Sequence, residues 1–231
     1  MLSPLLSEIQ NQASLEKAKI YARFFKCGPG QYGEGDQFLG LTVPQSRSIA
    51  KKYLTLSEMD LEKLLLSSIH EHRLIALLIL VEKFKKADED TKKDIVHFYL
   101  AHTTQINNWD LVDLSADKIL GNYLLDKDRA ILYRLVRSSL LWERRISIIT
   151  TFAFIRQKQF GDTFKLAELL LNDKQDLMHK AVGWMLREVG KRDEAALERF
   201  LQKHYRNMPR TTLRYAIERF DKEKKKRYMG K

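Results

Sequence analysis

The sequence of 231 residues contains a single cysteine, Cys27, and no long apolar run. One cysteine excludes an internal disulfide framework and any cysteine-rich metal site, and we expect its thiol to be passive. No stretch approaches the roughly 18 apolar residues that a membrane span needs. The first residues, MLSPLLSEIQNQ, have no cationic region before their apolar residues, unlike a secretory signal. We therefore expect an intracellular, cytoplasmic protein that does not enter a membrane.

Signals for β-strands, metal ions and nucleotide phosphates are also missing. No hairpin signal and no alternating strand pattern of useful length occurs. The six histidines are scattered, and none belongs to an H-E-x-x-H zinc motif. Gly28, Gly30 and Gly33 match G-x-G-x-x-G, but the segment before them is helical and no Gly-Lys-Ser/Thr follows. We expect no metal and no cofactor, and interpret residues 27–40 as an ordered surface loop that contacts a ligand through Tyr32.

The charge is strongly unbalanced, with 41 Lys and Arg against 30 Asp and Glu and a net charge of +11. Such a surplus is compatible with a polyanionic partner, of which nucleic acid is the commonest. The last ten residues hold six of these cations and one acid, Glu223. We interpret residues 1–221 as a single domain and residues 222–231 as a frayed basic tail.

The chain consists of amphipathic helices separated by short polar breaks. Helices are expected over residues 2–12 and 15–26, with Ser14 capping the second, and another begins after Thr42 with Pro44 in its first turn. Further apolar helices begin near 72, 109, 145 and 180, which is a spacing of 37, 36 and 35 residues, and one more amphipathic helix fits between each pair. This period is typical of an all-α solenoid of HEAT-like helix pairs, about five to six here, with equivalent helices along one concave surface. The end repeats are polar enough to predict a monomer.

The segment from Asn107 to Gly121 places a carboxylate beside an apolar stripe. If the segment is one helix, Trp109 and Asp113 lie four residues apart on one face, with Val112 and Ala116 on the stripe. A carboxylate there needs a cation, a hydrogen bond or a ligand to compensate it. The structural alternative is a core tryptophan and an aspartate that interacts with the positive end of the helix.

A second helix, residues 177–191, carries an aromatic ring among cations. The face opposite its apolar stripe carries four side chains, namely Lys180, Trp184, Arg187 and Lys191. A tryptophan outside the core and next to three cations suits a phosphate backbone with a stacked base or sugar. Gly183 would let a ligand approach closely. The alternative is that a neighbouring helix covers Trp184.

Arg145 borders the apolar stripe of the helix over residues 142–157, as Asp113 borders its own. The two charges form either a structural ion pair between repeats or the rim of a cleft, in which Arg145 holds a phosphate. Arg47 and Lys51 share one face of the helix after Thr42, and we add them to the candidate DNA-binding residues.

Taken together, W-D-x-V-D followed by L-G, then W-x-x-R, and K-A-x-G-W-x-L-R-E resemble the AlkD-type alkylpurine DNA glycosylases, a family of HEAT-like repeats. The resemblance extends over about residues 15–220. It implies that Asp113 is the catalytic carboxylate, that Trp109 and Trp184 frame it, that Arg145 is the active-site arginine and that Arg187 is a further cation of the DNA groove. Phe24 departs from the tyrosine of some members, so a hydroxyl contact would be lost unless Tyr21 or Tyr32 supplies it.

The chemistry that the resemblance implies is hydrolysis of cationic N3- or N7-alkylated purines from double-stranded DNA, without metal or cofactor. Such a base is already a good leaving group, and a carboxylate stabilises the oxocarbenium-like sugar. The family also implies that the lesion is held without entering a tight pocket, unlike most glycosylases. Two other functions remain open at this point. One is a HEAT-repeat protein that binds distorted or branched DNA without catalysis, and the other is a protein scaffold with no affinity for DNA.

Overall fold

The computed structural model describes residues 1–230, and within them it is all-helical without a β-strand. It divides into two compact units, Met1–Ser115 and the chain from Ala116 onward. The first unit contains α1 (Leu2–Asn11), α2 (Leu15–Phe24), α3 (Val43–Lys52), α4 (Glu58–Leu65), α5 (His70–Lys86), α6 (Glu89–Ala101) and α7 (Trp109–Asp113). The second contains the π-helical turn η1 (Asp117–Gly121), α8 (Ala130–Leu135), α9 (Leu141–Arg156), α10 (Gly161–Leu170), α11 (Asp176–Gly190), α12 (Glu194–His204), α13 (Arg210–Ala216) and α14 (Lys222–Met229).

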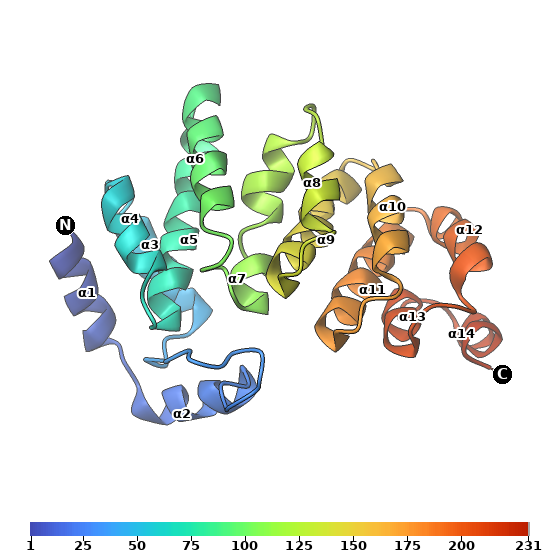
Figure 1. Ribbon diagram of the computed structural model, residues 1–231, viewed down its shortest axis with the longest axis horizontal. Coiled ribbons are helices and arrows are strands. Elements are labelled where there is room, and N and C mark those ends of the chain that lie inside the picture. The colour runs from blue at the N-terminus through green and yellow to red at the C-terminus, as the bar shows by residue number, and fades with distance from the viewer. Residues whose placement is uncertain (231) are drawn as a thin grey trace. The chain divides into compact units, whose positions relative to one another are not determined.

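Alternate helices pack on one another within each unit. In the first unit α5 packs against α3 and α7, and in the second α11 packs against α9 and α13. The helices between them pack against these helices, α4 on α5, α10 on α9 and α11, and α12 on α11 (Figure 1). This arrangement is the α-solenoid of helix pairs that the sequence period predicts. The four expected repeat helices begin at or shortly before the predicted positions, at His70, Trp109, Leu141 and Asp176.

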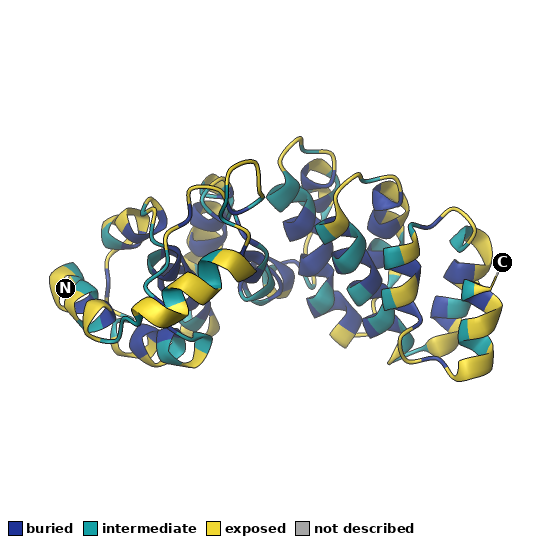
Figure 2. Cartoon of the chain, turned by 90° about the horizontal axis from the view of Figure 1, so that it is seen from below, coloured by how far each residue is buried: buried dark blue, intermediate teal, exposed yellow. Residues whose placement is uncertain are grey.

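Burial explains why these segments are helical. Most helices carry buried residues on one side and exposed residues on the other (Figure 2). α5 is the exception in the first unit, because its apolar run from Leu74 to Val81 is buried all round. It is the central helix of that unit, so residues near its ends, such as His70, have protein on every side.

Two predicted helix starts are confirmed in atomic detail. The Ser14 hydroxyl accepts a hydrogen bond from the Lys17 amide at 3.4 Å, and Thr42 forms a full capping box with Gln45. Ser and Thr at these positions satisfy backbone donors that have no partner inside the helix. The caps fix where α2 and α3 begin, and the cap at Thr42 also marks where the glycine-rich segment before α3 ends.

Two details differ from the sequence prediction. Residues 107–121 are not one helix, since α7 ends at Asp113 and η1 begins at Asp117. The Ser115 hydroxyl lies between them and donates to the Leu111 carbonyl at 2.6 Å, and such side-chain bonds compete with the helical ladder. The segment expected to be a frayed tail forms helix α14 from Lys222 to Met229, with Tyr228 buried. The domain limits at residues 221 and 222 stay a prediction.

Candidate functional site

Trp109 and Asp113 lie at the two ends of the short helix α7 in the first unit. The Asn108 side-chain oxygen accepts a hydrogen bond from the Trp109 amide at 2.8 Å, which starts the helix. Leu111 and Val112 turn into the core, whereas Trp109 and Asp113 are both half-buried. The sequence predicts that Trp109 and Asp113 lie on one face of a helix. In the structure both side chains reach the surface of the unit, although α7 is short.

The Trp109 ring is held by phenylalanine rings from the end of α2. It stacks on Phe25 with centroids 5.2 Å apart and meets the edge of Phe24 at 5.9 Å. Phe25 stacks in turn on Phe38 at 5.0 Å, and Phe38 stacks on the His70 ring at 4.6 Å. Phe24 itself is 61% exposed. The hydroxyl of Tyr32 donates to the Phe24 carbonyl at 3.5 Å, so Tyr32 lies close to Phe24.

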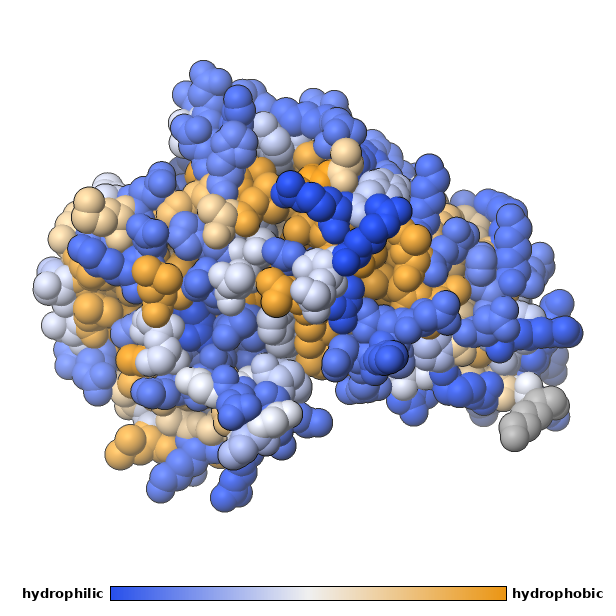
Figure 3. Space-filling view, in the orientation of Figure 1, coloured by the Kyte–Doolittle hydropathy of each residue, from blue (hydrophilic) through white to orange (hydrophobic). Residues whose placement is uncertain are grey.

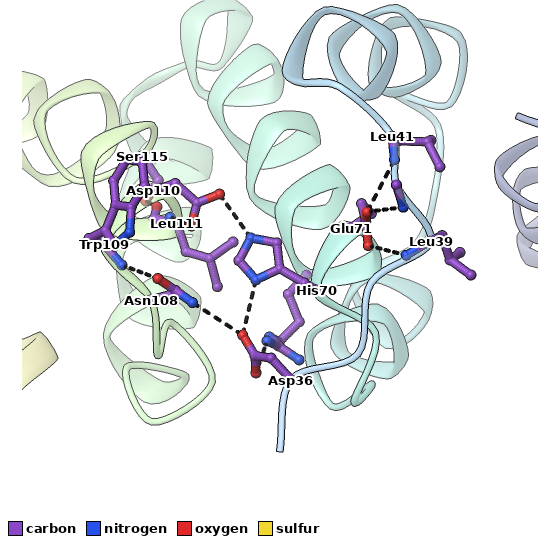
Figure 4. A network of polar contacts seen from close by, with 12 residues as sticks. Asp36, Leu39, Leu41, His70, Glu71, Asn108, Trp109, Asp110, Leu111 and Ser115 are labelled. Carbon is purple, nitrogen blue, oxygen red and sulfur yellow. Dashed lines mark hydrogen bonds and ion pairs between the residues drawn. The ribbon is translucent and has the colours of Figure 1, made fainter. Parts of the chain in front are cut away.

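A buried charge network lies directly below this aromatic column. His70, which is only 2% exposed, donates from Nδ1 to Asp36 at 3.1 Å and from Nε2 to Asp110 at 2.8 Å (Figure 4). Asp36 also accepts hydrogen bonds from Arg73 at 2.6 Å and from Asn108 at 3.3 Å. The network thus ties three segments together: the glycine-rich loop, the start of α5 and the start of α7.

The protonation state of the network follows from its geometry. Burial alone would lower the pKa of His70, but the charge of Asp110 and the hydrogen bonds to both carboxylates raise it to about 9. Burial would raise the pKa of Asp36, yet the hydrogen bond from His70 and the charge of Arg73 outweigh it and lower that pKa. At neutral pH the centre of the network is therefore an imidazolium between two carboxylates, which satisfies the need of a buried charge for a partner.

The glycine-rich loop is fixed to α5 by a second carboxylate. Glu71 is buried and accepts hydrogen bonds from the backbone amides of Leu39, Gly40 and Leu41 at 2.7 to 3.1 Å (Figure 4). Gly40 has a φ of +88°, and a Cβ there would lie 2.3 Å from the Ser14 carbonyl oxygen. Only glycine fits this conformation and this close approach. The segment is therefore a loop anchored on α5.

Cys27 lies half-buried at the start of this loop. Burial and the nearby charge of Asp36 raise the pKa of its thiol to about 11, while the charge of Arg73 acts in the opposite direction. At neutral pH the side chain is a protonated thiol, whereas the thiolate is the nucleophilic form. Its pKa supports the passive role that the sequence predicts.

In the second unit, Arg145 is held inside the fold. Its side chain on α9 is 5% exposed, and its Nη1 donates to the Leu177 carbonyl at 2.6 Å, next to the start of α11. A buried guanidinium with this anchor has a fixed position. The pairing of Arg145 with Asp113 stays a prediction, as does the proximity of Trp109 to Trp184.

Trp184 is half-buried and neighbours a phenylalanine that binds two arginines. Its ring centroid is 5.9 Å from that of Phe152 on α9. The guanidinium of Arg156 lies 4.5 Å from the Phe152 ring, and that of Arg192 lies 5.7 Å from it. Trp184 therefore belongs to a cationic aromatic cluster, as the sequence suggested for this residue, but Phe152, Arg156 and Arg192 were not foreseen. No sequence motif connects these residues, because Phe152 and Arg156 lie near the end of α9 and Arg192 follows the end of α11.

The three cations expected around Trp184 each have a carboxylate partner. Lys180 binds Asp176 at 2.7 Å, Lys191 binds the buried Glu188 at 2.6 Å, and Arg187 binds Glu218. The exposed pair of Lys180 and Asp176 contributes about 0–1 kcal/mol, so a phosphate could displace that carboxylate. In the first unit Arg47 and Lys51 lie on α3, and no described residue forms an ion pair with either.

Gly183 has a structural role in place of the expected ligand approach. A Cβ at this position would lie 2.5 Å from the Cβ of Tyr215 and 2.6 Å from the Thr212 carbonyl oxygen. The space beside α11 is thus filled by α13, and the glycine allows the two helices to pack closely.

The described residues contain no group of three His, Cys, Asp or Glu side chains that could hold a metal ion. No helix in that part of the chain is long and apolar enough to span a membrane.

Comparisons with known proteins point to one family. The family model described as "DNA alkylation repair enzyme" matches residues 5–220. The fold is similar to that of a solved structure described as a predicted DNA alkylation repair enzyme from Enterococcus faecalis, with a TM-score of 0.73 and 17% sequence identity. That match covers 91% of this chain and 98% of the other. No curated protein sequence matches the chain.

Proposed function

Because the chain belongs to the DNA alkylation repair enzyme family, we propose that it hydrolyses the N-glycosidic bond of N3- or N7-alkylated purines in duplex DNA. The observation that carries this proposal is the pair of half-buried side chains on α7, the Asp113 carboxylate and the Trp109 ring. The network below α7 holds this helix in place, so both groups are positioned before a substrate arrives. We expect the protein to act as a monomer on DNA inside the cell.

The proposed reaction requires little acid catalysis. Alkylation at N3 or N7 gives the purine a positive charge, so the base leaves as a neutral molecule with the electron pair of the bond to C1′. The sugar becomes an oxocarbenium-like cation, which the negative charge of Asp113 stabilises. Asp113 also orients the water that attacks C1′ and accepts its proton. The faces of Trp109 and Trp184 stabilise the cationic nucleotide through their π-electrons.

DNA is held, in this proposal, by cations of both units. The small exposed part of the otherwise buried Arg145 contacts a phosphate next to the lesion, while Lys180, Arg187 and Lys191 exchange their carboxylate partners for backbone phosphates. Arg47, Lys51 and Tyr32 contact the duplex from the first unit. The Phe152 cluster supports this part of the proposal, since arginines and rings in contact are suited to a nucleic acid backbone and a stacked base.

The decisive experiment compares base release by the wild type and by Asp113→Asn. Methylated duplex DNA is incubated with each protein, and free 7-methylguanine and 3-methyladenine are measured. We expect release by the wild type and a loss on the order of 10²-fold or more in the variant, with DNA affinity retained. Asp90→Asn is the matched control, because Asp90 is an exposed aspartate on α6.

Other results would lead to other functions. If neither protein releases a base but both bind DNA tightly in a salt-dependent manner, the chain is a non-catalytic DNA-binding protein. Equal release by wild type and Asp113→Asn would mean that another group performs the chemistry.

A further inference from the structure

A basic pocket lies in the second unit, and none of its lining residues belongs to the proposed site. It has a volume of about 430 Å³ and is lined by Gln202, Lys203, Tyr205, Arg206, Arg227 and Tyr228. These residues come from the end of α12 and from α14, where Figure 3 shows a mainly hydrophilic surface. The volume falls in the range of small-molecule sites, roughly 300–1,000 Å³. Three cations and no acid line it, so the pocket is suited to an anion.

Tyr228 supplies a buried donor that has no partner. The residue is 3% exposed, and its ring packs edge-on against Tyr205 at 5.4 Å. Within residues 1–230 no atom forms a hydrogen bond with the Tyr228 hydroxyl. Burial raises the pKa of this phenol, so it remains a hydrogen-bond donor at neutral pH. Buried hydroxyls are normally satisfied, and an oxygen of a ligand in the pocket would satisfy this one.

The cations of the pocket lack acidic partners as well. Among the described residues, no carboxylate forms an ion pair with Lys203, Arg206 or Arg227. Their neighbour Lys224 differs, because it binds Glu194 and Glu198 and so joins α14 to α12. The guanidinium of Arg206 lies 5.7 Å from the Tyr205 ring, and its Nε donates to the Tyr205 hydroxyl at 3.1 Å.

Arg227 is placed in a similar way, with its guanidinium 5.9 Å from the Tyr228 ring. Each arginine therefore has a tyrosine ring beside it and keeps terminal N–H groups available. This combination of two guanidinium groups and a phenol donor is well suited to the tetrahedral oxygens of a phosphate.

We propose that this pocket binds the phosphate group of a nucleotide, with Arg206 and Arg227 as charge partners and the Tyr228 hydroxyl as a donor. The phosphate belongs either to a DNA strand, which would extend the proposed function, or to a free nucleoside monophosphate. Binding here does not depend on base excision, since no residue of the pocket belongs to the proposed catalytic site.

The test uses the full-length protein and three variants. Tyr228→Phe removes only the hydroxyl, and Arg206→Gln/Arg227→Gln removes two charges. Arg134→Gln/Lys165→Gln is the control with the same change of net charge, since both residues are exposed cations of the second unit outside the pocket. Melting temperatures are measured first. Tyr228→Phe should melt no lower than the wild type, because its hydroxyl has no internal partner to lose.

Binding is then measured with two kinds of probe, unmethylated duplex DNA at several salt concentrations and AMP with inorganic phosphate by calorimetry. If the source is DNA, the double variant weakens DNA binding about tenfold and reduces the slope of log K against log salt by about 0.9, the value for one phosphate. If the source is a free nucleotide, wild type binds AMP or phosphate, both pocket variants lose it, and the DNA slope is unchanged.

Equal behaviour of the pocket variants and the Arg134→Gln/Lys165→Gln control with every probe would overturn the proposal. Because the DNA is unmethylated, this result is independent of base excision. Asp113→Asn should retain all of this binding even if it releases no base.

Discussion

At the scale of single residues, the most constrained side chain is His70. It is surrounded by Asp36, Asp110 and Arg73, and the ring is stacked on Phe38. Removal of one partner from such a buried group leaves an uncompensated charge, which costs about 3–5 kcal/mol. The charged form of this histidine therefore contributes to the stability of the loop and of both helix starts that meet there.

This charge predicts how stability depends on pH. The pKa of His70 is raised from 6.5 to about 9 on folding, so its contribution is complete below pH 6.5 and is lost as pH rises to about 9. The free energy of unfolding, measured with urea at a series of pH values, should fall by on the order of 3 kcal/mol across this window. Asp36 affects stability in a different pH range. Because its pKa is lowered on folding, its contribution to stability is lost only as pH falls below about 4.

The variant His70→Asn tests the assignment. It should be strongly destabilised at pH 6.5 and lose the decrease between pH 6.5 and 9. His97→Asn is the control, since His97 is exposed on α6. His72 does not interfere, because its pKa is lowered by burial and its effect lies below pH 6.5. A wild-type stability that is constant from pH 6.5 to 9 would show that the ring is neutral in the folded protein.

At the scale of secondary-structure elements, α11 packs into the core of its unit on one side and carries Trp184 on another. Val182, Met185 and Leu186 are buried in the core of the unit, while Trp184 is half-buried beside Phe152 of α9. Between these faces Gly183 brings α11 against α13. The position of Trp184 therefore depends on a helix contact that begins one residue earlier in the chain.

Gly183→Ala should lower the free energy of unfolding by about 1–3 kcal/mol, because the new Cβ would collide with the backbone of α13 at Thr212. Urea denaturation measures the change. Gly161→Ala, at the start of α10, is the matched control, since no atom lies within 4 Å of its Cβ position. It should be neutral or slightly stabilising, by up to about 1 kcal/mol. Equal effects of both substitutions would mean that α11 and α13 do not pack this closely.

The secondary structure is the level that the sequence predicts best. Contacts between residues that lie far apart in the sequence are much harder to predict. The helices, the caps at Ser14 and Thr42 and the all-α solenoid follow from local patterns, which act over a few residues. The network does not, since Asp36 meets Asn108 across 72 positions, and nothing near either residue indicates the other. The end of α7 at Asp113 is not visible in the sequence, because the helical spacing of apolar residues continues past Ser115. The backbone of the structure, however, leaves the α-helical conformation there.

The candidate site was predictable where residue type alone is informative. Trp109 and Asp113 are both half-buried on α7, and Trp184 is half-buried beside Phe152, while the roles assigned to these residues stay predictions. The ion pairs of Lys180, Arg187 and Lys191 could not be foreseen, because a pattern of cations does not say which acids the fold brings near.

At the scale of the whole molecule, the net charge of +11 predicts salt-dependent binding to DNA. Log K for duplex DNA should fall linearly with log salt, with a slope of about 0.9 per phosphate contacted. Substitution of Lys180, Arg187 and Lys191 by Gln should reduce this slope by about one unit per residue. Filter binding or fluorescence anisotropy at 50 to 200 mM salt gives the slope.

The matched control replaces Lys63, Lys85 and Lys92 by Gln. These lysines also form ion pairs with acids, so the charge change is the same and each substitution breaks one pair, although Glu218 lies outside the helix of Arg187. If both triple variants give the same slope, binding arises from the overall charge and not from the face around Trp184. A protein without affinity for DNA at 50 mM salt would be a scaffold.

The state of the lone cysteine has a practical consequence for such experiments. Cys27 is half-buried, and its thiol has a pKa of about 11, so at neutral pH almost none of it is thiolate. Maleimide reagents react with thiolates. A cysteine introduced at an exposed position such as Lys93 can therefore be labelled with a dye while Cys27 remains in place, and the glycine-rich loop around it is left undisturbed.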